Sequence, residues 1–156
     1  MDFKIREIRE DEYPILAEFL YEAIFIPEGA EKPLRSIIQR PELQVYIADF
    51  GKRDDFCFVA EVKKKPVGAV WARIMNDYGH VDDETPSLAI ALYQGYRSLG
   101  IGTEMMKAML RLLKEKGYQK TSLSVQKENY AVRMYKNIGF EVVKENEEEY
   151  LMVCGL

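Results

Sequence analysis

The sequence has little histidine and cysteine, the residues from which most zinc and redox sites are built. Its 156 residues include one histidine, His80, and two cysteines, Cys57 and Cys154. These three residues do not form the paired spacing of a zinc site. Both cysteines fall in segments that have the pattern of β-strands, where a free thiol behaves as a small apolar side chain. We therefore expect two buried free thiols and no metal site.

An excess of basic residues and a long apolar run are also missing. The 22 Lys and Arg residues against 26 Asp and Glu residues give a formal net charge of −4, whereas nucleic-acid-binding proteins usually have a basic surface. No apolar run approaches the roughly 20 residues of a membrane-spanning helix. The first six residues lack the apolar core of a signal peptide. We expect a cytoplasmic protein with no nucleic-acid or membrane partner.

The length of the chain and the lack of repeats or linkers favour a single domain over residues 1–156. Its hydrophobic content of 47% and charged content of 31% are typical of soluble globular proteins. A chain of this length can enclose one sizeable core.

The most informative stretch of the chain runs from residue 88 to residue 117. The apolar run at residues 88–92 is typical of a buried strand. From Ile101 onward apolar residues recur at helical spacing, and Gly117 stands where helices commonly end in a left-handed residue. The passage between them is Arg97-Ser98-Leu99-Gly100-Ile101-Gly102. A strand thus leads through glycines into a helix, whose free N–H groups and partial positive charge suit a phosphate.

Two common phosphate-binding motifs do not fit this turn. A dinucleotide fingerprint needs a third small residue where Met105 stands, and a P-loop needs a lysine where Ile101 stands. The pattern that remains is Arg-x-x-Gly-x-Gly between a buried strand and a helix. Taken by itself, this pattern has an alternative explanation, in which the glycines only shape a tight turn.

The rest of the chain alternates between strand and helix patterns. We predict strands near residues 3–8, 56–62, 67–74, 121–125, 140–143 and 150–154, separated by polar turns. Asp11 is the predicted cap of a first helix, and Pro41 the predicted end of a short second helix that contains Leu34, Ile37 and Ile38. Residues 43–50 fit either a helix or a strand, and we favour the helix.

This order of elements predicts an α/β fold. Only the two strands on either side of the Gly100 helix are joined by a crossover long enough for a parallel pair. We therefore expect a mixed, mostly antiparallel sheet with a central parallel pair and helices on both faces. The site should lie at the carboxyl ends of the two parallel strands.

A second motif lies further along the chain. Asn129 and Ala131 are followed by Tyr135 and then by Gly139-Phe140. Together with the Arg-x-x-Gly-x-Gly turn, this segment resembles the signatures of the GCN5-related N-acetyltransferases (GNAT family), although one spacer residue is missing between Asn129 and Ala131. The resemblance covers nearly the whole chain and is weakest before residue 50. It implies the acyl-CoA N-acyltransferase fold and acetyl-coenzyme A as co-substrate, with no metal.

The resemblance also implies a role for particular residues. Ile90 and Leu92 would offer main-chain groups to the pantetheine arm and the thioester, with the Leu92 N–H as oxyanion donor. Asn129 would contact the coenzyme arm, and Tyr135 would protonate the departing thiolate. The pyrophosphate would be wrapped by the main chain of Arg97, Ser98, Leu99, Gly100, Ile101, Gly102 and Thr103.

Each of these residues also has a simpler structural explanation. Asn129 is a good helix cap, Tyr135 lies on an apolar stripe and is a reasonable core residue, and Arg97 could form a surface salt bridge. The side chains of Ile90 and Leu92 belong to the core in any case.

The resemblance implies transfer of an acetyl group to a primary amine of a small molecule or peptide, by direct attack in a ternary complex. No carboxylate matches a fixed family position, so no general base is assigned. Acids gather in two regions of the chain: Glu22, Glu28, Glu31, Asp82, Asp83 and Glu84. Solvated surface charge is the simpler explanation for most of them, while their number suggests a cationic acceptor such as a polyamine, an aminoglycoside-like drug or a peptide amino group. The alternative is a non-catalytic acyl-coenzyme A sensor that regulates a partner. The sequence leaves the oligomeric state open, a homodimer included.

Overall fold

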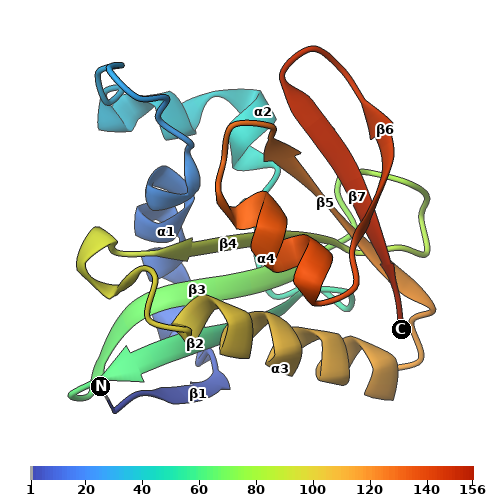
Figure 1. Ribbon diagram of the computed structural model, residues 1–156. Helices are drawn as coiled ribbons and strands as arrows, with labels where there is room; N and C mark the ends of the chain where they lie inside the picture. Colours follow the sequence, from blue (N-terminus) through green and yellow to red (C-terminus); the bar gives the residue numbers. More distant parts are fainter. Residues whose placement is uncertain (1) are drawn as a thin grey trace.

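The computed structural model describes residues 2–156 and has an open sheet with helices on both faces (Figure 1). Within these residues seven strands form one sheet in the order β1-β2-β3-β4-β5-β7-β6. The strands are β1 (Lys4–Glu7), β2 (Phe56–Val62), β3 (Lys65–Arg73), β4 (Ser87–Leu92), β5 (Lys120–Gln126), β6 (Glu141–Glu145) and β7 (Glu149–Gly155). Neighbouring strands are antiparallel except for the parallel pair β4 and β5. The mixed, mostly antiparallel sheet predicted from the sequence is confirmed.

The helices lie on opposite faces of this sheet. They are α1 (Leu16–Ala23), α2 (Pro41–Gln44), α3 (Ile101–Glu115) and α4 (Ala131–Asn137), with 3-10 helices η1 (Glu10–Ile15), η2 (Arg35–Gln39) and η3 (Gln94–Tyr96). In Figure 1, α3 and α4 pass in front of the sheet and α1 passes behind it. The two faces have separate apolar clusters, one built on α3 and the other on α1.

Helix α3 forms because its apolar residues fall on one stripe. Met105, Met106, Met109 and Leu113 are completely buried against the sheet, and the charged residues face away from it. The helix stops before Gly117, whose φ of +93° is the left-handed conformation common after a helix end. This long helix fixes the position of its own first turn, which contains the glycine motif.

The opposite face is tied down by polar contacts as well as by apolar packing. The indole N–H of the fully buried Trp71 donates to the Tyr46 carbonyl at 2.9 Å. Arg73 forms a buried ion pair with Asp55 at 2.9 Å and also donates to the Val45 carbonyl. These bonds hold the segment after α2 against the sheet.

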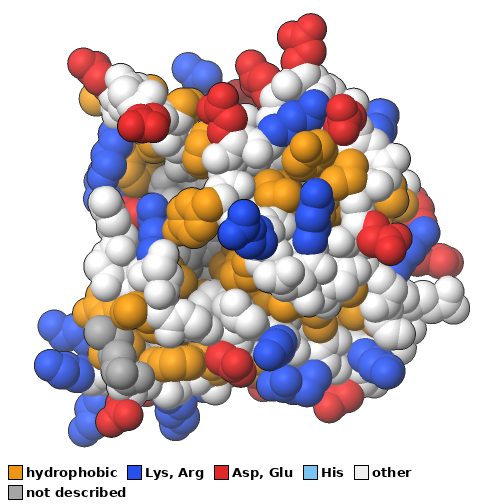
Figure 2. Space-filling model, in the orientation of Figure 1, with side chains coloured by type: hydrophobic (Ala, Val, Ile, Leu, Met, Phe, Trp, Pro, Cys, Tyr) orange, Lys and Arg blue, Asp and Glu red, His pale blue; other side chains and the backbone are white. Residues whose placement is uncertain are grey.

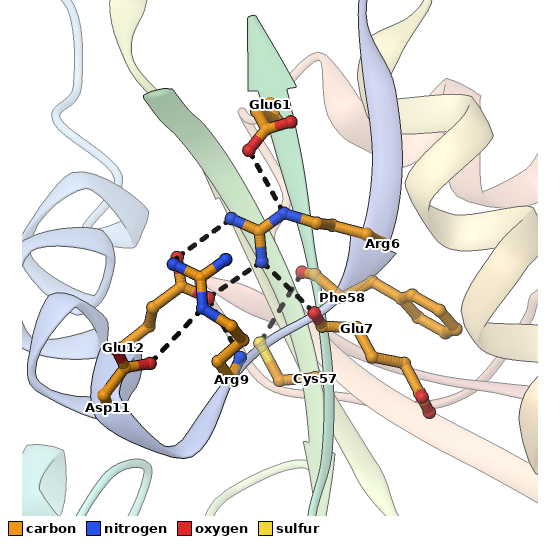
Figure 3. A network of polar contacts seen from close by, with 8 residues as sticks. All are labelled: Arg6, Glu7, Arg9, Asp11, Glu12, Cys57, Phe58 and Glu61. Atoms are coloured by element: carbon orange, nitrogen blue, oxygen red, sulfur yellow. Dashed lines mark hydrogen bonds and ion pairs between the residues drawn. The ribbon is translucent and has the colours of Figure 1, made fainter. Parts of the chain in front are cut away.

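A second polar network anchors the start of the chain to the sheet (Figure 3). The guanidinium of Arg6 on β1 donates two hydrogen bonds to the Glu12 carboxylate, at 2.8 and 2.9 Å, and one to Glu61 on β2 at 3.2 Å. Glu12 also accepts the N–H of Arg9. The network fixes η1, and therefore the start of α1, relative to β1 and β2.

Several local predictions before residue 50 are wrong. Asp11 lies inside η1 and does not cap the first helix, because the chain first forms a 3-10 turn over residues 10–15. Leu34 lies outside η2 and is 82% exposed. The short helix η2 does contain Ile37 and Ile38 and ends at Gln39, just before Pro41. Pro41 also begins α2, which was not predicted, since a proline at the first helical position loses no hydrogen bond. Residues 41–44 are helical and are followed by turns, so the helix was the better choice for this region.

Candidate active site

Strands β4 and β5 separate soon after they meet. Within the described part of the chain they pair in register only at Ser87 and Ser122, where the Ser122 N–H donates to the Pro86 carbonyl at 3.0 Å. Beyond this pair the two strands diverge, as Figure 1 shows. The edge of β4 that faces β5 therefore has main-chain groups that no neighbouring strand uses.

The hydrogen-bonding pattern of β4 indicates which groups face the gap. The Tyr93 N–H donates to the Val67 carbonyl at 2.9 Å, so Tyr93 points its main chain toward β3. Along an antiparallel strand, the main-chain N–H and C=O groups of successive residues face opposite edges. Those of Tyr93 face β3, so those of Leu92 and Ile90 face the β5 side. The Leu92 carbonyl accepts a hydrogen bond from Arg97 Nε at 2.9 Å, which leaves the N–H groups of Ile90 and Leu92 directed into the gap.

The turn before α3 also leaves main-chain donors free. Ser98 has a φ of +61° and Gly100 a φ of +85°, and α3 begins directly afterwards. The N–H groups of residues 98–103 make no hydrogen bond within residues 2–156. These donors and the helix dipole together form a region that favours an anion.

Asn129 precedes α4 and is fixed by its own hydrogen bond. Its Oδ1 accepts the Ala131 N–H at 2.9 Å, the bond expected of a helix-capping side chain. Asn129 therefore satisfies a free donor at the start of α4 from one position before Tyr130, the residue at the helix boundary. Asn129 also lines the cleft described below.

Tyr135 is both a core residue and a cleft residue. The residue is 6% exposed, and its ring packs edge-on against Phe140 with centroids 6.0 Å apart. Its hydroxyl makes no hydrogen bond with residues 2–156 and keeps some exposure to solvent. Because Tyr135 lines the cleft described below, the hydroxyl opens to that cleft. Burial raises the pKa of Tyr135 above its ordinary value, and Tyr130 adds to the shift. The phenol therefore stays protonated at neutral pH and can donate a proton.

These features meet in one cleft of about 1030 Å³. In the view of Figure 2 the surface is hollowed between the α1 side of the molecule and α4. The predicted site residues that line it are Ile90, Leu92, Arg97, Ser98, Gly100, Gly102, Thr103, Asn129 and Tyr135. Two predicted site residues do not line it: the Ile101 side chain is fully buried, and Leu99 is 50% exposed. A Cβ on Gly102 would meet only ordinary contacts, the nearest being Met134 Sδ at 3.6 Å.

Arg97 does not contribute a free main-chain donor as predicted, because its N–H donates to the Gln94 carbonyl at 3.3 Å. Its side chain is also engaged: Nε donates to the Leu92 carbonyl, and Nη2 donates to the carbonyl and the carboxylate of Glu22 at 3.3 and 3.4 Å. The alternative of a salt bridge is therefore correct, but the bridge lies in the cleft. Sequence reasoning missed this pair because the two residues are 75 positions apart.

Of the six acids named from the sequence, two line the cleft and four, including Glu31 and Glu84, do not. Glu22 and Glu28 line the cleft, together with the apolar segment Ile24, Phe25, Ile26 and Pro27. Asp82 instead bonds Thr85 and pairs with Lys120, and Asp83 pairs with His80. The cleft is therefore less acidic than the sequence suggested.

Comparison with known proteins gives a consistent result. A model of the acetyltransferase (GNAT) family matches residues 5–140. The chain is 33% identical over 115 residues to an N-alpha-acetyltransferase of Sulfurisphaera tokodaii, a match that covers 64% of this chain and 68% of that protein. It is 30% identical over 90 residues to the probable N-acetyltransferase camello of Xenopus tropicalis, and this match covers 56% of this chain and 40% of that protein.

Solved structures have the same fold. The PaiA N-acetyltransferase from Thermoplasma acidophilum in complex with coenzyme A aligns over 100% of both chains, with a TM-score of 0.73 and 18% identity. An acetyltransferase of the GNAT family from Staphylococcus aureus aligns over 99% of each chain, with a TM-score of 0.72 and 18% identity. At this identity the likeness concerns the fold.

Proposed function

The chain belongs to the acetyltransferase (GNAT) family, and we propose that it transfers an acetyl group from acetyl-coenzyme A to a primary amine of a small molecule or peptide. The single observation that supports this most is the cleft itself. One cavity joins the unpaired edge of β4, the free N–H groups before α3 and the Tyr135 hydroxyl. Residues 1–156 would act as one catalytic domain.

Binding of the coenzyme would use main-chain groups of the chain. The N–H groups of residues 98–103 would hold the pyrophosphate, since they are free and lie at the positive end of α3. The free edge of β4 at Ile90 would bind the pantetheine arm beside Asn129. The Arg97 side chain already contacts Leu92 and Glu22, so the turn would bind phosphate through its backbone and not through this guanidinium.

Acetyl transfer would proceed by direct attack of the amine on the thioester carbonyl in a ternary complex. The Leu92 N–H would stabilise the charge that develops on the carbonyl oxygen. As the new C–N bond forms, the C–S bond breaks, and the Tyr135 hydroxyl would give its proton to the departing sulfur. The amine attacks in its neutral form, after its ammonium has lost one proton to solvent. The proton that the nitrogen loses on forming the amide passes through solvent and restores the Tyr135 phenol, so atoms and charge balance.

Calorimetric titration with acetyl-coenzyme A, followed by a thiol-release assay with a panel of amines, tests this proposal. Binding together with thiol release in the presence of an amine is the expected result. The variant Gly102→Ala should fold normally, because the new Cβ finds only ordinary contacts, and should bind the coenzyme more weakly. Binding without release from any amine would favour the sensor alternative, and absence of binding would refute the assignment of the turn.

A further inference from the structure

The carboxylate of Glu22 lies beside the end of β4. Glu22 is in the last turn of α1, and its side chain is 18% exposed. One guanidinium, that of Arg97, contacts both the Leu92 carbonyl and Glu22 Oε2. The second oxygen of the carboxylate, Oε1, makes no hydrogen bond within residues 2–156. A partly buried carboxylate with one free oxygen, next to the strand that would hold the thioester, suits an ammonium group.

The remaining charges of the cleft do not suit a polycation. The charged residues that line it are Glu22, Glu28, Lys32, Arg97 and Glu128. Arg97 already occupies one oxygen of Glu22, and Lys32 adds a second positive charge to the cavity. Three carboxylates against two cations give the lining a net charge of −1, which one ammonium balances. A polyamine or an aminoglycoside would leave an excess of positive charge close to Lys32 and Arg97. The cleft therefore accommodates one positive charge better than three.

Next to Glu22 the wall of the cleft is apolar. The chain leaves α1 through Ile24, Phe25, Ile26 and Pro27, all of which line the cleft, and the first three are half-buried. Each end of the segment has a local turn bond: the Ile24 N–H donates to the Tyr21 carbonyl, and the Ala30 N–H donates to the Pro27 carbonyl at 3.0 Å. The Tyr21 hydroxyl donates to the Pro33 carbonyl at 2.6 Å, which ties the chain after the segment back to α1. An apolar wall beside the Glu22 carboxylate favours an amphiphilic ligand.

We infer that the acceptor is a monocationic primary amine carried on an apolar or aromatic body, with its ammonium at Glu22 Oε1 and its body against the segment 24–27. The inference rests on the proposed function and specifies its substrate. It replaces the polyamine and aminoglycoside expected from the number of acids in the sequence. An arylalkylamine and a peptide that begins with an apolar residue share this chemistry, and an acceptor panel separates them.

The test compares 2-phenylethylamine, a short peptide that begins with phenylalanine, ethylamine, spermidine and kanamycin at saturating acetyl-coenzyme A. We expect kcat/KM to be about 10-fold or more higher for the first two than for the polycations. Glu22→Gln should raise the amine KM about 10- to 100-fold and leave the KM for acetyl-coenzyme A unchanged. Phe25→Ala should raise the KM for 2-phenylethylamine but not for ethylamine.

The matched control is Glu18→Gln. Glu18 lies one turn earlier on α1 and forms the same kind of ion pair, with Arg35 at 3.0 Å, but does not line the cleft. The Glu18→Gln variant should leave the KM of every amine unchanged. A preference for spermidine or kanamycin, or equal effects of Glu22→Gln and Glu18→Gln, would overturn the inference.

Binding measurements separate this inference from the proposed function. Calorimetry of 2-phenylethylamine and of spermidine with the protein–coenzyme A complex measures selectivity without turnover. Tighter binding of 2-phenylethylamine, lost in Glu22→Gln, would support the inference even if no amine is acetylated. Tighter binding of spermidine would refute it even if the protein is an active acetyltransferase.

Discussion

At the scale of single residues, Tyr135 shows how one side chain can serve packing and chemistry together. Its ring is buried against Phe140, whereas its hydroxyl opens to the cleft. The sequence suggested both roles, and the structure is compatible with both at once. A phenylalanine at this position would keep the packing and remove only the hydroxyl, so the two roles can be separated.

Tyr135→Phe should reduce kcat by about 10²- to 10⁴-fold, the usual contribution of a positioned proton donor. The affinity for acetyl-coenzyme A, measured by calorimetry, should not change. Because burial raises the pKa of this phenol, the hydroxyl stays protonated through the neutral range and should not cause a fall in rate below pH 10. An unchanged kcat in a variant with normal thermal unfolding would remove Tyr135 as the acid.

Glu12 illustrates a residue whose charge matters for stability. Its carboxylate is 10% exposed and accepts two hydrogen bonds from Arg6. The bonds from Arg6 are the main reason that the pKa of Glu12 is lowered to about 2. A carboxyl whose pKa is lower in the folded protein adds stability that is complete above its unfolded pKa and disappears as the pH falls through the folded value.

Glu12→Gln should therefore lower the free energy of unfolding by roughly 2 kcal/mol at pH 7, after allowance for solvent screening. The variant should also lose less stability than the wild type between about pH 4.5 and 2. Urea unfolding at several pH values measures both effects. Asp11→Asn is the control from the same network (Figure 3), since Asp11 is 77% exposed and pairs only with the exposed Arg9; a similar loss in both variants would contradict the argument.

At the scale of helices and strands, regular patterns were predictable and irregular ones were not. The strand at residues 56–62 and the helix that begins at Ile101 follow directly from their side-chain periodicity. Before residue 50, the 3-10 helices η1 and η2 and the four-residue α2 are too short to have a comparable periodic signal. Pro41 was assigned only to the end of a helix, although it also begins α2, a position that proline tolerates equally well. Tertiary contacts decide between such alternatives, and these contacts cannot be inferred from a single sequence.

The hairpin between β2 and β3 contains a conformation that its sequence does not favour. Val62 pairs with Lys65, so Lys63 and Lys64 form a two-residue turn, and both have positive φ values of 51° and 67°. Residues with a Cβ are strained at positive φ, and two-residue turns of this kind usually contain Asn-Gly. Replacing Lys63-Lys64 by Asn-Gly should stabilise the protein by about 1 kcal/mol, or about 2–4 °C in Tm. Calorimetric unfolding measures the change, and a lower Tm would contradict the assigned turn.

At the scale of the whole molecule, the candidate site combines a local part with a long-range part. The phosphate turn and the Asn129–Tyr135 segment are local, so their motifs could be recognised in the sequence. The Glu22–Arg97 pair lies 75 positions apart in the sequence and joins α1 to the end of β4, where Arg97 contacts the Leu92 carbonyl. No spacing in the sequence indicates such a contact. The part of the site that would bind the coenzyme was therefore predictable, whereas the wall that would contact the acceptor required the fold.

The cleft joins the end of α1, β4, the start of α3 and α4, so a ligand bound there should stabilise the protein as a whole. Acetyl-coenzyme A at about 100 times its Kd should add about 2.7 kcal/mol, or about 5–10 °C in Tm for a chain of this length. Amide hydrogen exchange should slow at residues 98–103, whose N–H groups are free without a ligand, and not at the hairpin tip formed by Lys63 and Lys64. A rise in Tm without protection of residues 98–103 would place the coenzyme elsewhere on the molecule, because a phosphate held by these donors must retard their exchange.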